Sequence, residues 1–290
     1  MVFDGATITA FVPVIIWAAM MAFRGRFWRA DQRLEDAARE RDGWPEIVCV
    51  IPARNEAATI GLTVASLLGQ DYPGDFSIVV VDDNSQDGTT YAVPTDARLT
   101  LLAGKPLPPG WTGKLWAVNQ GLEKAAEFAA DAEYVMLGDA DIEHDPDSFR
   151  RLVAKAEAEE GLDLVSLMVL LRTENFWEIL LIPAFVFFFQ KLYPFAWVND
   201  PGRKTAAAAG GCMLVRLSAL ERIGGVAAIR GRVIDDCALA AAIKNSGGRI
   251  WLGLSDKVRS IRAYEGLSDI WSMVTRTAFV QLRHSALMLA

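Results

Sequence analysis

The chain has 290 residues, of which 52% are apolar and 22% charged, with a formal net charge of −7 and a mean hydropathy of +0.22. Such an apolar composition excludes a disordered chain, and the length allows one large domain or two small ones. Nucleic-acid binding needs a concentrated basic face, and 29 Lys and Arg residues against 36 Asp and Glu residues argue against that partner.

The chain has few residues that bind soft metals. Its three cysteines, Cys49, Cys212 and Cys237, form no C-x-x-C motif, and its two histidines are His144 and His284. This pattern argues against a zinc site or a disulfide framework. A bound metal would therefore have carboxylate ligands, which favours Mg²⁺ or Mn²⁺.

Residues 1–23 are predicted to form an N-terminal transmembrane helix. Residues 5–23 are 19 consecutive uncharged residues, which as a helix would be about 28 Å long, close to the thickness of a bilayer core. Arg24, Arg26 and Arg29 follow this run rather than precede it, which argues against a cleaved signal peptide and places the N-terminus outside and the rest in the cytosol. The alternative is a helix buried in a protein core.

Two further segments are predicted to contact the membrane. Residues 176–198 are apolar and aromatic, but charges leave an uncharged core of only 11 residues, 179–189, which we expect to be too short to span. This segment is predicted to be an interface helix that lines the entrance for a lipid, or alternatively a buried helix. Residues 263–290 are predicted to add another interface helix and the start of a further apolar segment.

Between these segments, a charged and helical linker is predicted for residues 24–45 and an α/β domain for residues 46–262. Short apolar runs rich in β-branched residues alternate with segments of helical spacing. The predicted strands are 47–51, 76–81, 134–137 and 164–170, and the predicted helices are 57–70, 115–130 and 146–160. This alternation predicts a mostly parallel sheet flanked by helices, with the ligand at the carboxyl ends of the strands.

Acidic residues follow several of these strands. They are Glu56 after the first strand, Asp82 and Asp83 after the second, Asp139 and Asp141 after the third, and Asp235 and Asp236 at the start of a later helix. Any single cluster could be a turn or a helix cap, and for Asp235 an N-cap is an equal alternative. Several clusters at one sheet edge would repel each other unless a cation joins them.

The residue types suggest particular chemistry at this edge. Asp139 and Asp141 could bind a divalent ion that also holds phosphate oxygens, and the ion would then neutralise a departing diphosphate. Lys114 opens a predicted helix, where an amine and free N–H groups favour phosphate, although a surface lysine is the alternative. A carboxylate beyond the metal site could take a proton from an attacking hydroxyl.

Five motifs in this order resemble the inverting family 2 glycosyltransferases, which have a GT-A fold. They are VIPARNE (50–56), VVDDNSQDGT (80–89), GKLWAVNQG (113–121), GDAD (138–141) and IDD (234–236), and the similarity covers about residues 46–262. Longer stretches, including PLPPGWTGKLWAVNQG and LIPAFVFFFQKLYPFAWVNDP, look like the hopanoid biosynthesis-associated group of this family.

The resemblance implies roles for individual residues. Pro52, Arg54 and Glu56 would line the nucleotide pocket, with Asp82 or Asp83 contacting the uracil or ribose of a UDP-sugar. Lys114 and Asp139 would lie beside the nucleotide-sugar, and Asp139 and Asp141 would be the ligands of Mg²⁺ or Mn²⁺. Asp236, next to Asp235, would be the general base. The acceptor would approach Gly210, Gly211, Cys212, Phe187 and Phe188.

One motif departs from the family pattern. Processive relatives carry Q-x-x-R-W, whereas residues 281–285 here are QLRHS. Arg276 and Arg283 are the candidates for the cation on the diphosphate, and transfer of a single sugar is favoured over processive synthesis.

Together these observations predict a membrane-bound enzyme in the bacterial cytoplasmic membrane. It would transfer one sugar from a UDP-sugar to a lipid hydroxyl, such as that of a hopanoid, at the cytosolic face, in contact with other lipid-biosynthesis enzymes. The alternatives are a polyprenyl-phosphate sugar synthase and a non-catalytic scaffold that binds a nucleotide-sugar.

Overall fold

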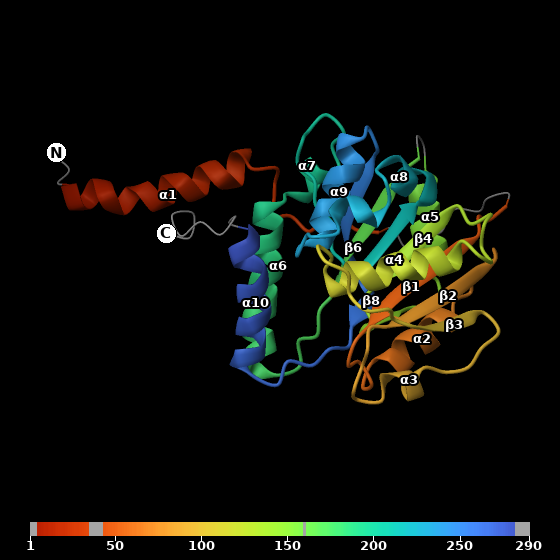
Figure 1. Cartoon of the computed structure of the whole chain (residues 1–290). Coiled ribbons are helices and arrows are strands. Elements are labelled where there is room, and N and C mark those ends of the chain that lie inside the picture. The colour runs from red at the N-terminus through yellow and green to blue at the C-terminus, as the bar shows by residue number, and fades with distance from the viewer. Residues whose placement is uncertain (1–4, 35–42, 159–160, 282–290) are drawn as a thin grey trace.

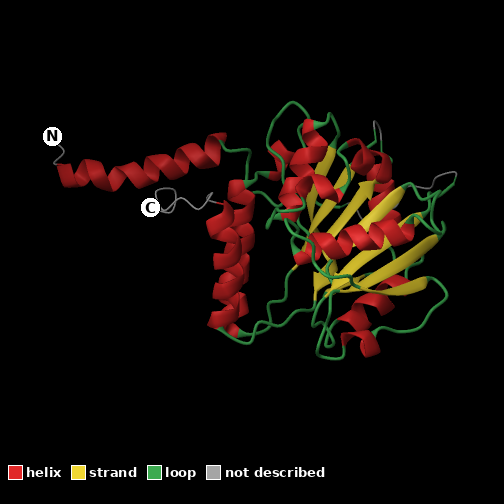
Figure 2. Cartoon of the chain, in the orientation of Figure 1, coloured by secondary structure: helices red, strands yellow, loops and turns green. Residues whose placement is uncertain are grey.

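The computed structural model describes residues 5–34, 43–158 and 161–281. A large sheet lies between two layers of helices, and three further helices lie beside it (Figures 1 and 2). The strands are β1 (Ile47–Ala53), β2 (Phe76–Asp82), β3 (Leu99–Ala103), β4 (Tyr134–Gly138), β5 (Ile142–His144), β6 (Leu164–Leu170), β7 (Cys212–Arg216) and β8 (Ile250–Ser260).

Two sets of helices flank or extend this sheet. Those packed on it are α2 (Ile60–Leu68), α4 (Gly113–Ala125), α5 (Ser148–Ala156), α8 (Leu217–Arg222), α9 (Asp235–Asn245) and the 3₁₀ helix η1 (Val226–Ile229), with the short α3 (Thr89–Ala92) and α7 (Phe195–Val198) in connections. Beside the sheet lie α1 (Gly5–Phe23), α6 (Phe176–Leu192) and α10 (Leu267–Gln281).

The sheet is mixed, with the order β3-β2-β1-β4-β7-β6-β8-β5. Strands β3, β2, β1 and β4 are parallel neighbours, as are β6 and β8, whereas β7 is antiparallel to both β4 and β6. Strand β5 is antiparallel to β8. The parallel pairs agree with the predicted mostly parallel sheet, while β7 and β5 run in the reverse direction and make the sheet mixed.

Alternating side chains on the central strands fill a core on each face of the sheet. Along β1, Val48 and Val50 join the core under α4 and α9, while Ile47, Cys49 and Ile51 join the core under α2 and α5. All five are at most 1% exposed. Strands covered on both faces need apolar residues at every position, which is why the continuous apolar runs predicted these strands correctly.

The four predicted strands and three predicted helices are all present, although the helices are shorter than predicted. Four strands were not predicted. Strand β3 is a partly exposed edge strand, and β5 has only three residues. Strand β7 directly precedes helix α8, where a short apolar run does not distinguish strand from helix. Strand β8 carries charged residues in its second half, so it is not a continuous apolar run.

The segment predicted as a helical linker is different in the structure. Its described part, residues 24–34, contains turns and an isolated bridge between Arg33 and Leu254 instead of a helix. Phe27 is 2% exposed and packs edge-to-face on Phe187 of α6, with 5.5 Å between ring centroids. Burial of this ring and pairing with β8 outweigh the helical propensity of the segment.

Helix α1 extends away from the sheet, and α6 and α10 lie side by side (Figure 1). The described side chains of α1, residues 11–23, are mostly exposed, which excludes the buried-core alternative for this part. The stretch of this helix whose side chains are described, Phe11–Phe23, is by itself shorter than a span, and the N-terminal transmembrane helix of residues 1–23 remains a prediction.

The second apolar segment corrects a prediction. Phe176–Val198 is long and apolar enough to cross a membrane by length and composition, although it was expected to be too short. Only 22% of the most apolar 18-residue stretch of this segment is buried. Length and apolar composition are shared by core helices of soluble proteins and by signal sequences, so they do not by themselves make this segment a membrane span. Helix α6 begins with a capping box, in which Asn175 and Glu178 bind each other's backbone N–H groups.

Candidate active site

The predicted acidic residues gather at the edge of the sheet where β1, β2 and β4 end. The loop after β1 and the loop after β2 are joined by hydrogen bonds in both directions. The N–H of Asn55 donates to Ser85 Oγ at 2.9 Å, and the N–H of Gln86 donates to Asn55 Oδ1 at 2.9 Å. Asn55 has a left-handed backbone with φ of 55°, which asparagine tolerates better than most residues.

These joined loops present the residues predicted for the nucleotide. Asp82 and Asp83 are 9% and 8% exposed, and Asp82 Oδ1 accepts a hydrogen bond from the N–H of Ser85. The guanidinium of Arg54 is 3.4 Å from Asp83 Oδ2, and the Arg54 side chain is 65% exposed. The structure therefore brings Arg54 and both acids together, with the arginine available to a ligand.

Lys114 links the carboxylates of two separate segments, the turn after β4 and the start of α9. Its amine is 2.8 Å from Asp139 Oδ1 and 3.4 Å from Asp235 Oδ2, and it lies in the first turn of α4, which Thr112 caps. Burial lowers the pKa of Lys114, but the facing Asp139, Asp235 and Asp236 carboxylates more than reverse this effect, so the pKa is raised. The Lys114 side chain, which is 37% exposed, therefore lies among carboxylates at the strand ends, and its role beside a phosphate stays a prediction.

Asp236 has the surroundings of a general base. Its Oδ2 accepts a hydrogen bond from the N–H of Gly210 at 2.9 Å, and its Oδ1 accepts one from the N–H of Cys237 at 2.6 Å. Burial, followed by the neighbouring Asp235 carboxylate, raises the pKa of Asp236 to about 6, although Lys114 acts in the opposite direction. A base with a pKa close to the working pH is effective in proton transfer.

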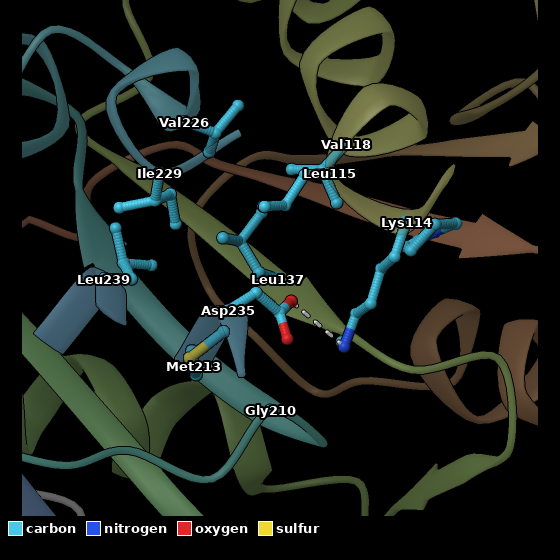
Figure 3. A pocket seen from close by; sticks show the side chains of 12 residues that line it. Lys114, Leu115, Val118, Leu137, Gly210, Met213, Val226, Ile229, Asp235 and Leu239 are labelled. Atoms are coloured by element: carbon cyan, nitrogen blue, oxygen red, sulfur yellow. Dashed lines mark ion pairs between the residues drawn. The ribbon is translucent and has the colours of Figure 1, made fainter. Parts of the chain in front are cut away.

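Asp235 is not a helix cap. The N-cap residue of α9 is Ile234, and the Asp235 side chain makes no capping hydrogen bond. Figure 3 shows its carboxylate pointing toward the Lys114 amine at the mouth of a small pocket. The rest of this pocket is mostly apolar and includes Leu115, Val118, Leu137, Met213, Val226, Ile229 and Leu239, together with Pro52, Gly138 and Gly210.

Arg262 also belongs to this cluster of charges, although it was not predicted from the sequence. Its Nε donates to Asp141 Oδ2 at 2.8 Å, and its Nη2 donates to Glu56 Oε1 at 2.5 Å. Burial lowers the pKa of Arg262, but the Asp141 and Glu56 carboxylates outweigh burial and raise it. The signal that could have indicated Arg262 is its position two residues after the end of β8 at Ser260. That strand end lies beside Asp141 only because β8 pairs with β5, which the sequence does not reveal.

The predicted metal ligands lie in the turn between β4 and β5. Asp139 uses Oδ1 for Lys114, and Asp141 uses Oδ2 for Ser260 and Arg262, which leaves one oxygen on each carboxylate for another ligand within the described chain. No group of three or more metal-binding side chains occurs among the described residues. Two carboxylates suffice for Mg²⁺ or Mn²⁺ when water and substrate phosphates complete the shell, so the residues fit such an ion.

The acceptor-side predictions differ in outcome. Gly210 contacts the Asp236 carboxylate, and Gly211 lies against Ile142 and Val169. Cys212 is fully buried in β7, where burial raises the pKa of its thiol to about 12, so it is not available to a ligand. This burial follows from its pairing opposite Gly138 inside the sheet.

The remaining predicted residues lie on the helices beside the sheet. Phe187 packs on Phe27, and Phe188 is 51% exposed on α6. Arg276 is exposed on α10, and Arg283 lies outside the described residues. The structure does not bring Phe187, Phe188 or Arg276 into the strand-end cluster, which contains Arg262 as its additional cation.

A mixed α/β sheet with a parallel half and acidic residues at the strand ends is typical of a GT-A-like fold. A family model described as glycosyl transferase family 2 matches residues 48–224, more than half of the chain. The chain therefore belongs to glycosyl transferase family 2.

Two curated relatives match parts of the chain. The succinoglycan biosynthesis protein ExoO of Rhizobium meliloti is 32% identical over 136 residues, which are 43% of this chain and 36% of that protein. The beta-monoglucosyldiacylglycerol synthase of Synechocystis sp. is 33% identical over 114 residues, 38% of this chain and 22% of that protein. The chain thus matches about a third or less of each relative's length.

Solved structures share the fold. The mannosyltransferase PcManGT from Pyrobaculum calidifontis, in complex with GDP-Man and Mn²⁺, has a TM-score of 0.65 at 22% identity over 94% of this chain and 74% of that chain. TarS of S. aureus has a TM-score of 0.51 at 16% identity over 81% of this chain and 39% of that chain. At these identities the likeness concerns the fold alone.

Proposed function

We propose that this protein is a membrane-associated, metal-dependent inverting glycosyltransferase that moves one sugar from a UDP-sugar to a lipid hydroxyl. The observation that carries the proposal is the Asp236 carboxylate. It is held by the N–H of Gly210, lies in the same charge cluster as Lys114, and has a pKa raised to about 6. A partly buried carboxylate with this pKa is suited to accept a proton from an alcohol at neutral pH.

The donor would lie along the strand ends. Asp82 or Asp83 would contact the uracil or ribose, with Pro52, Arg54 and Glu56 lining the same pocket. Asp139 and Asp141 would hold Mg²⁺ or Mn²⁺ through the oxygens that their cation partners leave available. A divalent ion bound there supplies neutralisation of the leaving diphosphate.

The chain's own residues would carry out the transfer in line. Asp236 takes the proton of the acceptor hydroxyl while the oxygen attacks the anomeric carbon and the bond from that carbon to the diphosphate breaks. The new bond forms opposite the leaving group, so the configuration inverts. The Lys114 ammonium group then exchanges its carboxylate partners for the departing UDP, because a diphosphate is a stronger partner for an amine than a single carboxylate.

A lipid acceptor is supported by the exposed apolar side chains of α1 and α6, among them Phe11, Ile15, Ile179 and Phe188. One relative is named for the synthesis of a glucosyl lipid. The resemblance to the hopanoid-associated group makes a hopanoid the acceptor we propose, at the cytosolic face of a bacterial membrane with the N-terminus outside.

The direct test incubates the purified full chain with UDP-sugars or GDP-mannose, Mn²⁺ and a membrane lipid extract, followed by mass spectrometry of the lipids. A mass increase of one hexose is expected with a UDP-sugar, and EDTA should abolish it. Transfer from GDP-mannose alone would overturn the choice of donor. Absence of any product with every donor would support the scaffold alternative.

The variant Asp236→Asn tests the base. It should abolish transfer to a hydroxyl while UDP and Mn²⁺ still bind, because it removes a base and no metal ligand. The matched control, Asp131→Asn, changes an exposed carboxylate and should leave transfer unchanged. Activity of Asp236→Asn toward a polyprenyl phosphate would instead favour the phosphate-acceptor alternative, since that acceptor is already ionised.

A further inference from the structure

A dense set of cationic and aromatic side chains lies where the end of α1 meets the end of α6. The Arg24 guanidinium donates to the backbone carbonyl of Lys191 at 2.7 Å and to that of Leu192 at 3.4 Å, at the carboxyl end of α6. The Trp28 indole N–H donates to the carbonyl of Met21 in α1 at 3.1 Å. These bonds fix the turn after α1 against the end of α6.

Cations in this region lie over aromatic rings. The Lys191 amine is 4.9 Å from the ring centroid of Trp17 and 5.2 Å from that of Phe188. The Trp197 ring has the guanidinium of Arg203 at 4.7 Å and that of Arg24, whose position the α6 carbonyls fix, at 5.8 Å. Cation–π contacts hold these charges at defined positions while leaving their N–H groups available to an anion.

The positive charge is local. Residues 24–33 hold four arginines and one aspartate, and residues 188–204 hold two lysines, one arginine and one aspartate, in a chain with a net charge of −7. Arg203 is 3.4 Å from Asp200 and Arg29 is 3.9 Å from Asp31, while Arg24 and Lys191 have no carboxylate partner among the described residues. This junction therefore carries excess positive charge on an acidic protein.

Large exposed apolar side chains continue from this junction along the helices. On α1 they include Ile15 at 65% and Phe23 at 82% exposure, and on α6 they include Ile179 at 59% and Leu180 at 54%. An apolar helical surface that ends in tryptophan and basic residues matches the change from acyl chains to headgroups in a bilayer.

We infer that this junction binds the anionic headgroups of a phospholipid bilayer. We define the basic–aromatic junction as Trp17, Arg24, Arg26, Trp28, Arg29, Phe188, Lys191, Trp197, Arg203 and Lys204. The apolar faces of α1 and α6 enter the acyl region, and the junction lies at the level of the phosphates, where each basic residue is attracted to an acidic leaflet. The inference rests on the proposed membrane association and is independent of the donor, the acceptor and the base.

The test uses the full chain in neutral maltoside micelles. Brominated phosphatidylglycerol or brominated phosphatidylcholine is added, and lipid binding is followed by quenching of the fluorescence of the nine tryptophans, which include Trp17, Trp28 and Trp197 of the junction. We expect half-maximal quenching at a roughly tenfold or more lower mole fraction of phosphatidylglycerol than of phosphatidylcholine. High salt should reduce this preference, because it screens the attraction.

The triple variant Arg29→Gln, Lys191→Gln and Arg203→Gln retains the Arg24 bonds to α6 and should lose most of the preference. The matched control changes three arginines of the sheet domain, Arg98, Arg150 and Arg222, to glutamine and should retain it. Equal quenching by both lipids in the unaltered chain would overturn the inference without depending on any variant.

Other outcomes also decide the question. Competition by inorganic phosphate at constant ionic strength would assign the junction to a free anion and overturn the lipid assignment. UDP binding by the triple variant should match that of the unaltered chain, so loss of the lipid preference alone does not bear on the proposed transferase reaction. A failed transferase assay with an intact lipid preference would overturn the enzyme proposal only.

Discussion

Replacement of the proposed base should stabilise the protein while removing its activity. The rise of the Asp236 pKa from 3.8 to about 6 corresponds to about 3 kcal/mol of unfavourable free energy for the charged form in the folded state. Asparagine has nearly the same shape and no charge. At pH 8 we therefore expect Asp236→Asn to be more stable to unfolding by up to about 3 kcal/mol.

The sign of this effect depends on pH. Below the unfolded pKa, Asp236 is protonated in both states and the unaltered chain has no penalty. As the pH rises from the unfolded value of 3.8 to the folded value of about 6, the unfolded state ionises before the folded state, and stability is lost relative to the asparagine variant. The difference between the two proteins should therefore be small near pH 4 and complete above pH 7.

Thermal or urea unfolding of both proteins at pH 4.5 and pH 8 measures this difference. The same ionisation should control the reaction rate. Below about pH 6, kcat/KM of the unaltered chain should fall about tenfold per pH unit, because the base becomes protonated. An asparagine variant that is inactive but no more stable at pH 8 would refute the claim that the site holds this carboxylate at a cost in stability.

Three further substitutions test the surroundings of the site. Arg262→Met should reduce kcat/KM for the donor about tenfold or more in a UDP-release assay, because it removes the cation on Asp141. The control Arg276→Met, on exposed α10, should change kcat/KM little, and equal losses in the two variants would contradict the role of Arg262. At Gly210 a Cβ would lie 3.4 Å from the Asp236 carboxylate, so alanine should slow turnover severalfold and valine far more, with unfolding unchanged for alanine. Glu178→Gln should lower the free energy of unfolding by roughly 2 kcal/mol in urea, because the buried carboxylate accepts backbone hydrogen bonds at the start of α6; unchanged stability would refute that role.

The central strands and the acidic strand ends could be predicted because their causes are local. A strand buried on both faces needs an apolar residue at each position, so runs such as 47–51 and 164–170 indicate strands by composition alone. Parallel strands place their carboxyl ends at one edge, so Asp82, Asp139 and their neighbours were expected there. The order of the motifs predicted the family, and the family model that matches residues 48–224 confirmed this prediction.

Other features depend on which segments meet in space, and no local pattern encodes that. Arg262 contacts Asp141 across 121 positions of sequence only because β8 lies beside β5, and Cys212 is buried because β7 enters the sheet in the antiparallel direction. The pKa values follow the same rule. The pKa of Asp236 is raised first by burial, which only the tertiary structure produces, and then by the carboxylate of Asp235, its neighbour in the sequence.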